Sequence, residues 1–260
     1  MKKIKFLDDN FFYGVLGIEN HNIDTATSHR FLFNAIRKNH HLINGDIFEF
    51  GVYKGHSLIS LAILLKKIGS NKMVYGFDTF SGFPPNSSEQ DNFKNFEMYK
   101  GIHFEESLVN DAFFSLKIKE YLIGKDINIS NISSSLDFSN VTFEELENKI
   151  TYLGLDNIKL IKGDFKDTIS SFFDEYTGQV FAANIDCDLY DGYMSCLPYL
   201  CDRLSSNGYI HLDEYYSLKF PGARLACIEF LESIDPSLNI TLKKNKTSKE
   251  EFERWYITKA

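Results

Sequence analysis

Four carboxylate side chains stand close together in two short motifs. Asp186 and Asp188 lie in IDCDLY (185–190), and Asp213 and Glu214 lie in HLDEY (211–215). Each pair follows an apolar run typical of a β-strand, and the carboxyl ends of strands in an open α/β sheet border the ligand crevice. Carboxylates about 4 Å apart at an effective dielectric near 20 repel by roughly 4 kcal/mol per pair. A hard divalent cation would neutralise them, so the pattern predicts a metal site.

A simpler interpretation of the same residues stays open. It places Asp213 and Glu214 in a solvated turn and uses Asp188 and Asp191 as caps of the next helix. Such caps are common because a carboxylate satisfies free backbone N–H groups at a helix start. The remaining motifs are needed to choose between a turn and a metal centre.

A glycine-containing loop, EFGVYKGHS (49–57), joins the first predicted strand to a helix. Gly51 and Gly55 let the backbone approach a ligand and open a helix whose N-terminus attracts anions. The loop is not a dinucleotide fingerprint, because Tyr53 fills the middle glycine position, and it lacks the GK[ST] of a P-loop. Asp78 ends the second predicted strand, where it can accept both hydroxyls of a ribose. Asp164 follows the third and can accept from an adenine amino group. Each acid alone is more typical of a turn or a helix cap, but both in register with the glycine loop favour an adenosine ligand.

Strand-like and helix-like segments alternate from residue 46 to the end of the chain. This alternation predicts a doubly wound, mostly parallel seven-stranded α/β sheet with helices on both faces. The predicted strands are Ile47–Val52, Met73–Phe77, Ile158–Lys162, Val180–Ile185, Tyr209–Leu212, Leu238–Lys243 and Arg254–Ile257, with a turn at Asn207-Gly208. The predicted helices between them are Ser57–Ile68, Asp167–Asp174, Asp191–Leu204 and Pro221–Ile234.

Two regions lie outside the alternation. Residues 1–45 are expected to form an N-terminal helical cap, with its best helix at Thr25–Lys38. Within the main domain, 46–260, residues 86–157 are too long for a plain loop. This insert has a polar stretch, 127–140, and then a helix that Asn140 or Thr142 caps and Gly154 ends. We interpret it as a lid over the crevice or as a subunit contact, and expect a homo-oligomer, a dimer.

Composition excludes several classes of protein. The chain has 260 residues, a net charge of −8 and a pI near 5.4, which argues against a nucleic-acid binder. Its four cysteines form no zinc pattern and are interpreted as reduced thiols of a cytoplasmic protein. No apolar run is long enough to span a membrane, and acidic residues interrupt the segment that should follow a basic signal-peptide start. We therefore expect a cytoplasmic location and no membrane partner.

Five segments in order resemble the macrocin O-methyltransferase family, which are class I S-adenosylmethionine enzymes that act on sugars of natural products. They are FEFGVYKG (48–55), GFDTFSGFP (76–84), GDF (163–165), IDCDLY (185–190) and FPGAR (220–224). The resemblance spans about residues 46 to 232 and implies a Rossmann-like methyltransferase fold, S-adenosyl-L-methionine and Mg²⁺ as cofactors, and a small-molecule sugar acceptor. The acidic motif is its specific part, since most class I methyltransferases share the glycine loop.

The resemblance also implies roles for individual residues. Mg²⁺ would be held by Asp186, Asp213 and Glu214, with Asp188 as general base. The family usually has aspartate where this chain has Glu214, so a longer side chain must reach the metal directly or through water. Cofactor contacts are expected from Glu49, Gly51, Tyr53, Gly55, Ser57, Asp78, Thr79, Asp164, Phe165 and Asp186. Acceptor contacts are expected from Tyr190, Tyr215 and Arg224. The alternative for the two tyrosines is simple packing, and Arg224 has an equal claim to a surface or interface role.

The expected chemistry is methylation of a sugar hydroxyl, which a cation activates and a carboxylate deprotonates. His56, His103 and His211 are alternative bases, although lone histidines are more often structural. A catechol-type methyltransferase is a second possibility, but it typically has a lysine shortly after the first ligand, where this chain has none. The third is a non-catalytic protein that binds S-adenosylmethionine as a sensor or subunit.

Overall fold

The centre of the protein is a seven-stranded sheet with the order β3-β2-β1-β4-β5-β7-β6. The structure, a computed structural model, describes residues 29–85, 88–248 and 251–260. β1 to β5 pair in parallel, and β7 is antiparallel to both of its neighbours. The strands are β1 Asp46–Phe50, β2 Val74–Asp78, β3 Ile158–Lys162, β4 Val180–Ile185, β5 Leu204–Leu212, β6 Ile240–Lys244 and β7 Trp255–Lys259. The predicted doubly wound, mostly parallel sheet is confirmed.

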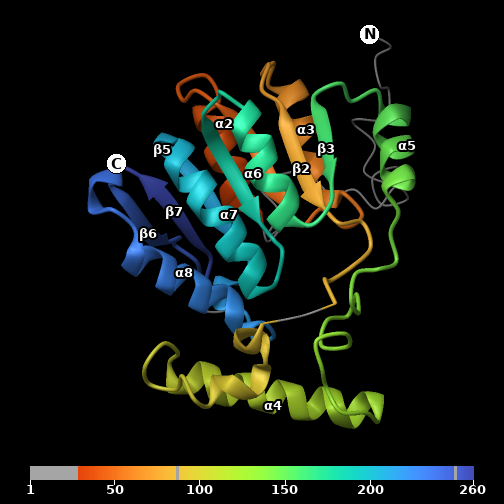
Figure 1. Ribbon diagram of the computed structural model, residues 1–260, viewed down its shortest axis with the longest axis vertical. Helices are drawn as coiled ribbons and strands as arrows, with labels where there is room; N and C mark the ends of the chain where they lie inside the picture. Colours follow the sequence, from red (N-terminus) through yellow and green to blue (C-terminus); the bar gives the residue numbers. More distant parts are fainter. Residues whose placement is uncertain (1–28, 86–87, 249–250) are drawn as a thin grey trace.

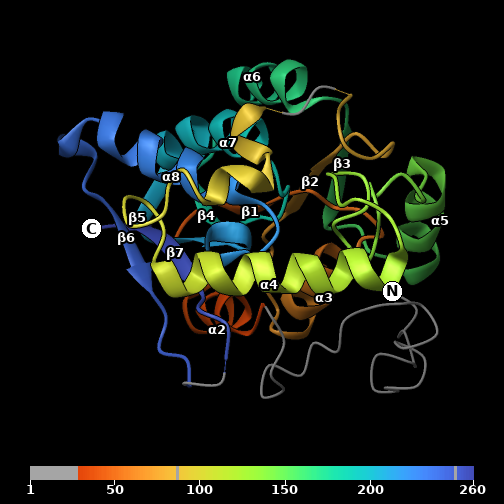
Figure 2. The ribbon, with the colours of Figure 1, turned by 90° about the horizontal axis from the view of Figure 1, so that it is seen from below.

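Helices cover both faces of this sheet (Figures 1 and 2). One face packs against α2, α3 and α5, and the other packs against α6, α7 and α8. Their bounds are α2 Arg30–Asn39, α3 His56–Lys67, α5 Phe143–Leu153, α6 Phe165–Glu175, α7 Tyr190–Arg203 and α8 Pro221–Ser233. In the described part of the chain, every helix is too short or too polar to cross a bilayer.

Local sequence signals explain the elements that were predicted best. All six residues of β4 are buried, as expected for an apolar run in the middle of a parallel sheet. β3 and β4 have their predicted bounds. Thr142 caps α5 by accepting from the Glu145 backbone N–H at 3.2 Å, and the Glu145 side chain accepts from the Thr142 N–H at 3.2 Å. Gly154 ends that helix in a left-handed conformation, as predicted.

Three expectations need correction. β5 begins at Leu204, before the expected turn; Asn207, at φ 61°, lies inside the strand at a shift in its register with β4. The N-terminal helix begins only at Arg30, and the first residues of the predicted helix, 25–28, lie outside the described residues. The insert contains a second helix, α4 Glu106–Ile123, which was not predicted.

The insert crosses the end of the sheet where the parallel strands finish. Its short helices η2 Glu89–Asp91 and η3 Phe93–Phe96 contact α8, and α4 runs below the strand ends in Figure 1. Inward side chains of α4 pack against Leu225 of α8 and against Leu189 and Phe220, which precede α7 and α8. The insert is therefore fastened near the acidic motifs.

Candidate functional site

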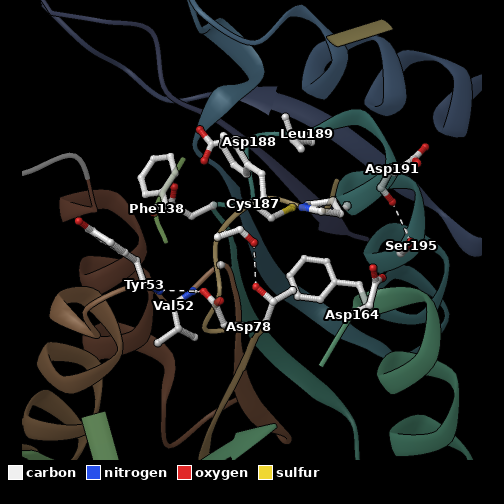
Figure 3. A pocket seen from close by; sticks show the side chains of 18 of the residues that line it. Val52, Tyr53, Asp78, Phe138, Asp164, Cys187, Asp188, Leu189, Asp191 and Ser195 are labelled. Carbon is white, nitrogen blue, oxygen red and sulfur yellow. Dashed lines mark hydrogen bonds between the residues drawn. The ribbon is translucent and has the colours of Figure 1, made fainter. Parts of the chain in front are cut away.

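A cavity lies at the carboxyl ends of β1, β2 and β4, where the strand order reverses. Its volume is about 250 Å³. This switch point is the usual ligand crevice of an open α/β sheet. Nine predicted site residues line it, namely Gly51, Tyr53, Ser57, Asp78, Thr79, Asp164, Phe165, Asp186 and Asp188. Figure 3 shows side chains from both halves of the sheet around this cavity.

The glycine loop is held tightly against the end of β4. Gly51 has φ 86°, and a Cβ there would lie 1.9 Å from the Asp186 carbonyl oxygen, so only glycine fits without a backbone shift. One oxygen of Asp78 accepts from the backbone N–H of Val52 at 2.7 Å and of Tyr53 at 2.8 Å (Figure 3). Asp78 therefore shapes the loop as well as lining the cavity.

Two predicted cofactor residues, Glu49 and Gly55, do not line the cavity. Glu49 is fully buried; it accepts hydrogen bonds from Ser57 and, at 3.1 Å, from Asn184. Burial raises the pKa of Glu49 to about 8. Gly55 caps α3 at φ 77°, with the Leu146 side chain where a Cβ would be. Glu49 thus holds the loop through its contact with Ser57, and Gly55 is the cap at which α3 begins. Any contact of either residue with a cofactor stays a prediction.

Three carboxylates converge beside the cavity. Asp186, Asp213 and Glu214 each offer an oxygen within 4.8 Å of the other two. Burial raises the pKa of Glu214 well above its ordinary value, and neighbouring negative charges raise it further. Burial also opposes ionisation of Asp213, but nearby His211 and Arg254, each 3.6 Å away, keep its pKa below the usual range. The predicted ligands are thus brought together.

Asp188 reaches this region by a turn instead of a continued strand. β4 ends at Ile185, and Asp188 has φ 62°, a conformation uncommon for a residue with a side chain. Burial, then the charge of Asp186, raise the pKa of Asp188 well above its ordinary value. Asp188 thus lies beyond the end of the strand, and the turn places it in the lining of the cavity.

Two histidines border the acids, and their arrangement was not predicted. His29 Nε2 lies 3.7 Å from Asp186 Oδ2, and His29, His211 and Asp213 form a second group of metal-capable atoms within 4.8 Å. His211 is fully buried, and neither of its ring nitrogens has a hydrogen-bond partner among the described residues. His211 was considered only as a base; nothing in the sequence connects His29 to the distant acidic motifs.

The insert supplies a wall that sequence reasoning could not assign. Phe138 lines the cavity and contacts the Tyr53 ring edge to face, with ring centres 5.1 Å apart. The Tyr53 hydroxyl donates to Asn140 Oδ1 at 2.6 Å. From η2, buried Asp91 accepts from the Tyr190 backbone N–H at 2.8 Å and also lines the cavity. The insert therefore closes on both sides of the crevice.

The three predicted acceptor residues do not line this cavity. The Tyr190 hydroxyl donates to Glu229, and the Tyr215 ring packs on Trp255 at 4.9 Å. Arg224 is buried, forms an ion pair with Glu105 of the insert at 3.2 Å and lies over the Tyr215 ring. Arg224 has the contacts of an internal anchor, which is neither of its two predicted roles, and acceptor binding by all three residues stays a prediction.

The sheet and its crevice have the fold of a Rossmann-like class I methyltransferase. A family model described as "Macrocin-O-methyltransferase (TylF)" matches residues 30–122 and 98–240. The chain therefore belongs to the macrocin O-methyltransferase family.

Individual relatives are distant. A curated protein of Streptomyces olivaceus, 8-demethyl-8-(2,3-dimethoxy-alpha-L-rhamnosyl)-tetracenomycin-C 4'-O-methyltransferase, is 23% identical over 176 residues, covering 66% of this chain and 54% of the relative. The chain thus spans about half the length of that relative. Among solved structures, the calicheamicin methyltransferase CalS11 has a TM-score of 0.59 at 18% identity, covering 88% of this chain and 76% of CalS11. The O-methyltransferase NovP has a TM-score of 0.58 at 17% identity, covering 87% and 76%. These structural similarities concern the fold.

Proposed function

We propose that this protein is an S-adenosylmethionine-dependent O-methyltransferase that acts on a sugar hydroxyl and uses Mg²⁺. The observation that carries the proposal is the position of three converging carboxylates directly beside the crevice at the sheet's switch point. Family membership supports the reaction. The name of the Streptomyces relative, a methyltransferase of a rhamnosyl compound, supports a sugar acceptor.

The crevice offers the groups that an adenosine cofactor needs. Gly51 permits close approach of the backbone, Asp78 presents a carboxylate at the end of β2, and Phe165 offers an apolar surface beside Asp164. When bound, S-adenosylmethionine supplies an electrophilic methyl group on a sulfonium sulfur. The residues of the crevice hold and orient this cofactor, so that its methyl group and the acceptor oxygen can meet in line.

The acidic cluster fits a hard divalent cation. Asp213 Oδ1 is buried and accepts no hydrogen bond among the described residues; His211 and Arg254 face it at 3.6 Å, beyond hydrogen-bond distance. Carboxylate oxygens from Asp186, Asp213 and Glu214 are the ligand type that Mg²⁺ prefers. When bound, the ion would lower the pKa of a hydroxyl on its acceptor side. The longer Glu214 side chain starts from η4 Glu214–Tyr216, immediately after β5.

Asp188 would then accept the proton of the acceptor hydroxyl. Its carboxylate lines the cavity and is buried, so water competes weakly for it. Burial and the charge of Asp186 favour the neutral form of Asp188 in the metal-free protein. A cation beside Asp186 would favour the ionised form, which is the form that can accept the proton. The expected activity consequently needs both the ligands and Asp188.

Thermal shift with S-adenosylmethionine and Mg²⁺, separately and together, tests the proposal on the whole chain. We expect the cofactor to stabilise the protein, and Mg²⁺ to stabilise it further in the wild type but not in Asp213→Asn. Methyl transfer to a panel of nucleotide-linked and free deoxysugars, followed by mass spectrometry, supplies the catalytic readout. Cofactor binding without methyl transfer to any sugar or catechol would favour a non-catalytic binder, and transfer to catechols alone would favour the catechol-type enzyme.

A further inference from the structure

Two buried histidines lie together beside the acidic cluster and have no part in the proposed reaction. His211 is in β5, and His29 immediately precedes α2, which packs on β4 and β5. Their rings meet edge to face, with centres 5.6 Å apart. His211 is fully buried and His29 is 5% exposed. Two segments far apart in the chain thus bring two imidazole rings together in the interior.

His211 is buried without the polar partners that an imidazole ring needs. In the part of the chain that the structure describes, neither of its ring nitrogens has a hydrogen-bond partner. A buried polar group left in this state costs about 1–3 kcal/mol, so it calls for a specific explanation. Asp213 Oδ1, which faces His211 Nε2, is also buried and accepts no hydrogen bond from the described residues. A cation between the two side chains would satisfy both.

The distances between these groups suit ligands of a common cation better than direct hydrogen bonds. His211 Nε2 lies 3.6 Å from Asp213 Oδ1, and His29 Nε2 lies 3.7 Å from Asp186 Oδ2. An ordinary N–H···O hydrogen bond is about 2.7–3.2 Å long. Two ligand atoms about 2.1 Å from a tetrahedral metal ion are about 3.4 Å apart. Ligand atoms of His29, His211 and Asp213 all lie within 4.8 Å of one another.

Two neighbouring side chains compete only weakly for these ligand atoms. Asn184 Nδ2 lies 3.4 Å from His29 Nε2, and Arg254 Nη1 lies 3.6 Å from Asp213 Oδ1. Both distances are longer than an ordinary N–H hydrogen bond. Arg254 adds a positive charge, but the other carboxylates of the acidic cluster oppose it. A second cation can therefore approach from the side of the two histidines.

We propose that His29, His211 and Asp213 bind a divalent transition-metal ion, at a second cation site beside the three carboxylates proposed for Mg²⁺. Imidazole nitrogen suits ions such as Zn²⁺, whereas Mg²⁺ prefers oxygen ligands, so the two sites differ in the metal that they select. Asp213 belongs to both groups of ligands and would link the two sites. The ion would also fasten the start of α2 to the sheet. The proposal does not depend on methyl transfer, because it rests on the buried histidines.

Binding of Co²⁺ and Zn²⁺ to the whole chain in excess Mg²⁺ tests this proposal. Mg²⁺ fills the carboxylate site, so the visible absorption of Co²⁺ and calorimetry with Zn²⁺ report the histidine site. Loss of an outer-shell partner of a metal typically costs about 10- to 100-fold in affinity, and we expect at least that loss in His29→Gln and in His211→Gln. His41→Gln, at an exposed histidine, is the matched control and should bind like the wild type. Circular dichroism checks that each variant is folded.

Glu214→Gln separates this site from the one proposed for Mg²⁺. It should weaken Mg²⁺ binding and leave the affinity for Zn²⁺ little changed, whereas His211→Gln should keep the thermal shift that Mg²⁺ produces. Failure of the wild type to bind Mg²⁺ would count against the proposed function and leave the histidine site standing.

X-ray absorption at the zinc edge of the wild-type complex supplies a readout that needs no variant. We expect it to show two imidazole ligands. A spectrum without imidazole, equal Zn²⁺ affinity in folded His211→Gln and the wild type, or displacement of Zn²⁺ by Mg²⁺ would overturn the proposal. Absence of Co²⁺ and Zn²⁺ binding to the wild type would also overturn it, in favour of buried water as the partner of His211.

Discussion

Asp188, the proposed general base, has an unusual backbone conformation that positions its side chain. Its left-handed backbone turns the side chain into the cavity after β4 has ended, and such conformations persist where the surrounding structure fixes them. Asparagine tolerates this conformation and keeps the size of the side chain, so it removes the basic oxygen with little change in structure.

For Asp188→Asn we expect kcat to fall by about 10²- to 10⁴-fold, because a positioned general base contributes that much. The thermal shifts produced by S-adenosylmethionine and by Mg²⁺ should remain. Steady-state kinetics with the best sugar acceptor measures the loss, and Asp174→Asn, at an exposed residue of α6, is the control. Full turnover by Asp188→Asn would show that another group takes the proton.

The sequence predicted the positions of the acidic site residues better than those of the two neighbouring histidines. Asp186, Asp213 and Glu214 follow recognisable strands, and parallel strands end at one edge, so their meeting could be expected. His29 immediately precedes α2, a helix on one face of the sheet, and its approach to Asp186 depends on tertiary packing. Packing of that kind leaves no local pattern in a single sequence.

Among the elements, α4 was missed for a physical reason. Prediction of a surface helix relies on one apolar face and one polar face. α4 has a buried face around Leu108 and Ala112 and an exposed apolar face around Phe114 and Ile118, so its pattern lacks a single period. α5, with a capping box and one buried face, was predicted to its C-terminal glycine.

The ion pair of Arg224 and Glu105 joins α8 to the insert, in addition to the apolar packing around Leu225. Glu105 is largely exposed, so the ion pair itself should contribute no more than about 1 kcal/mol. Its removal should act locally: in Glu105→Gln we expect faster hydrogen exchange over residues 97–116 and a raised KM for the acceptor, with kcat little changed. Glu97→Gln, an exposed acid near the same helix, serves as the control. Unchanged exchange in Glu105→Gln would mean that apolar packing alone holds the insert.

The order of strands and helices in the whole molecule was predictable because each element of the sheet has its own local sequence signal. Each strand has its own apolar run, and each crossover has a helix with start and stop signals, as for β3, α6 and β4. The insert departs from that rule. Its fold depends on contacts with α7 and α8, which follow it in the chain by many residues.

A buried acid below the crevice gives the whole protein a pH-dependent stability. Folding raises the pKa of Glu49 from 4.5 to about 8, since burial favours the neutral carboxyl. The resulting stabilisation is fully present below about pH 4.5 and is lost as the pH rises through about 8. Between these values Glu49 should lower the free energy of unfolding by up to about 1.4 kcal/mol per pH unit.

Glu49→Gln should remove this slope. Urea unfolding of both proteins without cofactor, at about pH 5.5, 6.5 and 7.5, measures the difference between them. The variant should gain stability relative to the wild type as the pH rises. Parallel pH profiles would indicate that Glu49 is already ionised in the folded protein.

The insert leaves the chain after β2 and returns before β3, and these two strands pair directly with each other. Its length and sequence can therefore change without any shift in strand register, since a longer surface loop costs little extra closure entropy. The acidic motifs lie on later, separate connections, after β4 and β5. A change of length or sequence in the insert can consequently alter the wall formed by Phe138 and Asp91 and leave the two acidic motifs as they are.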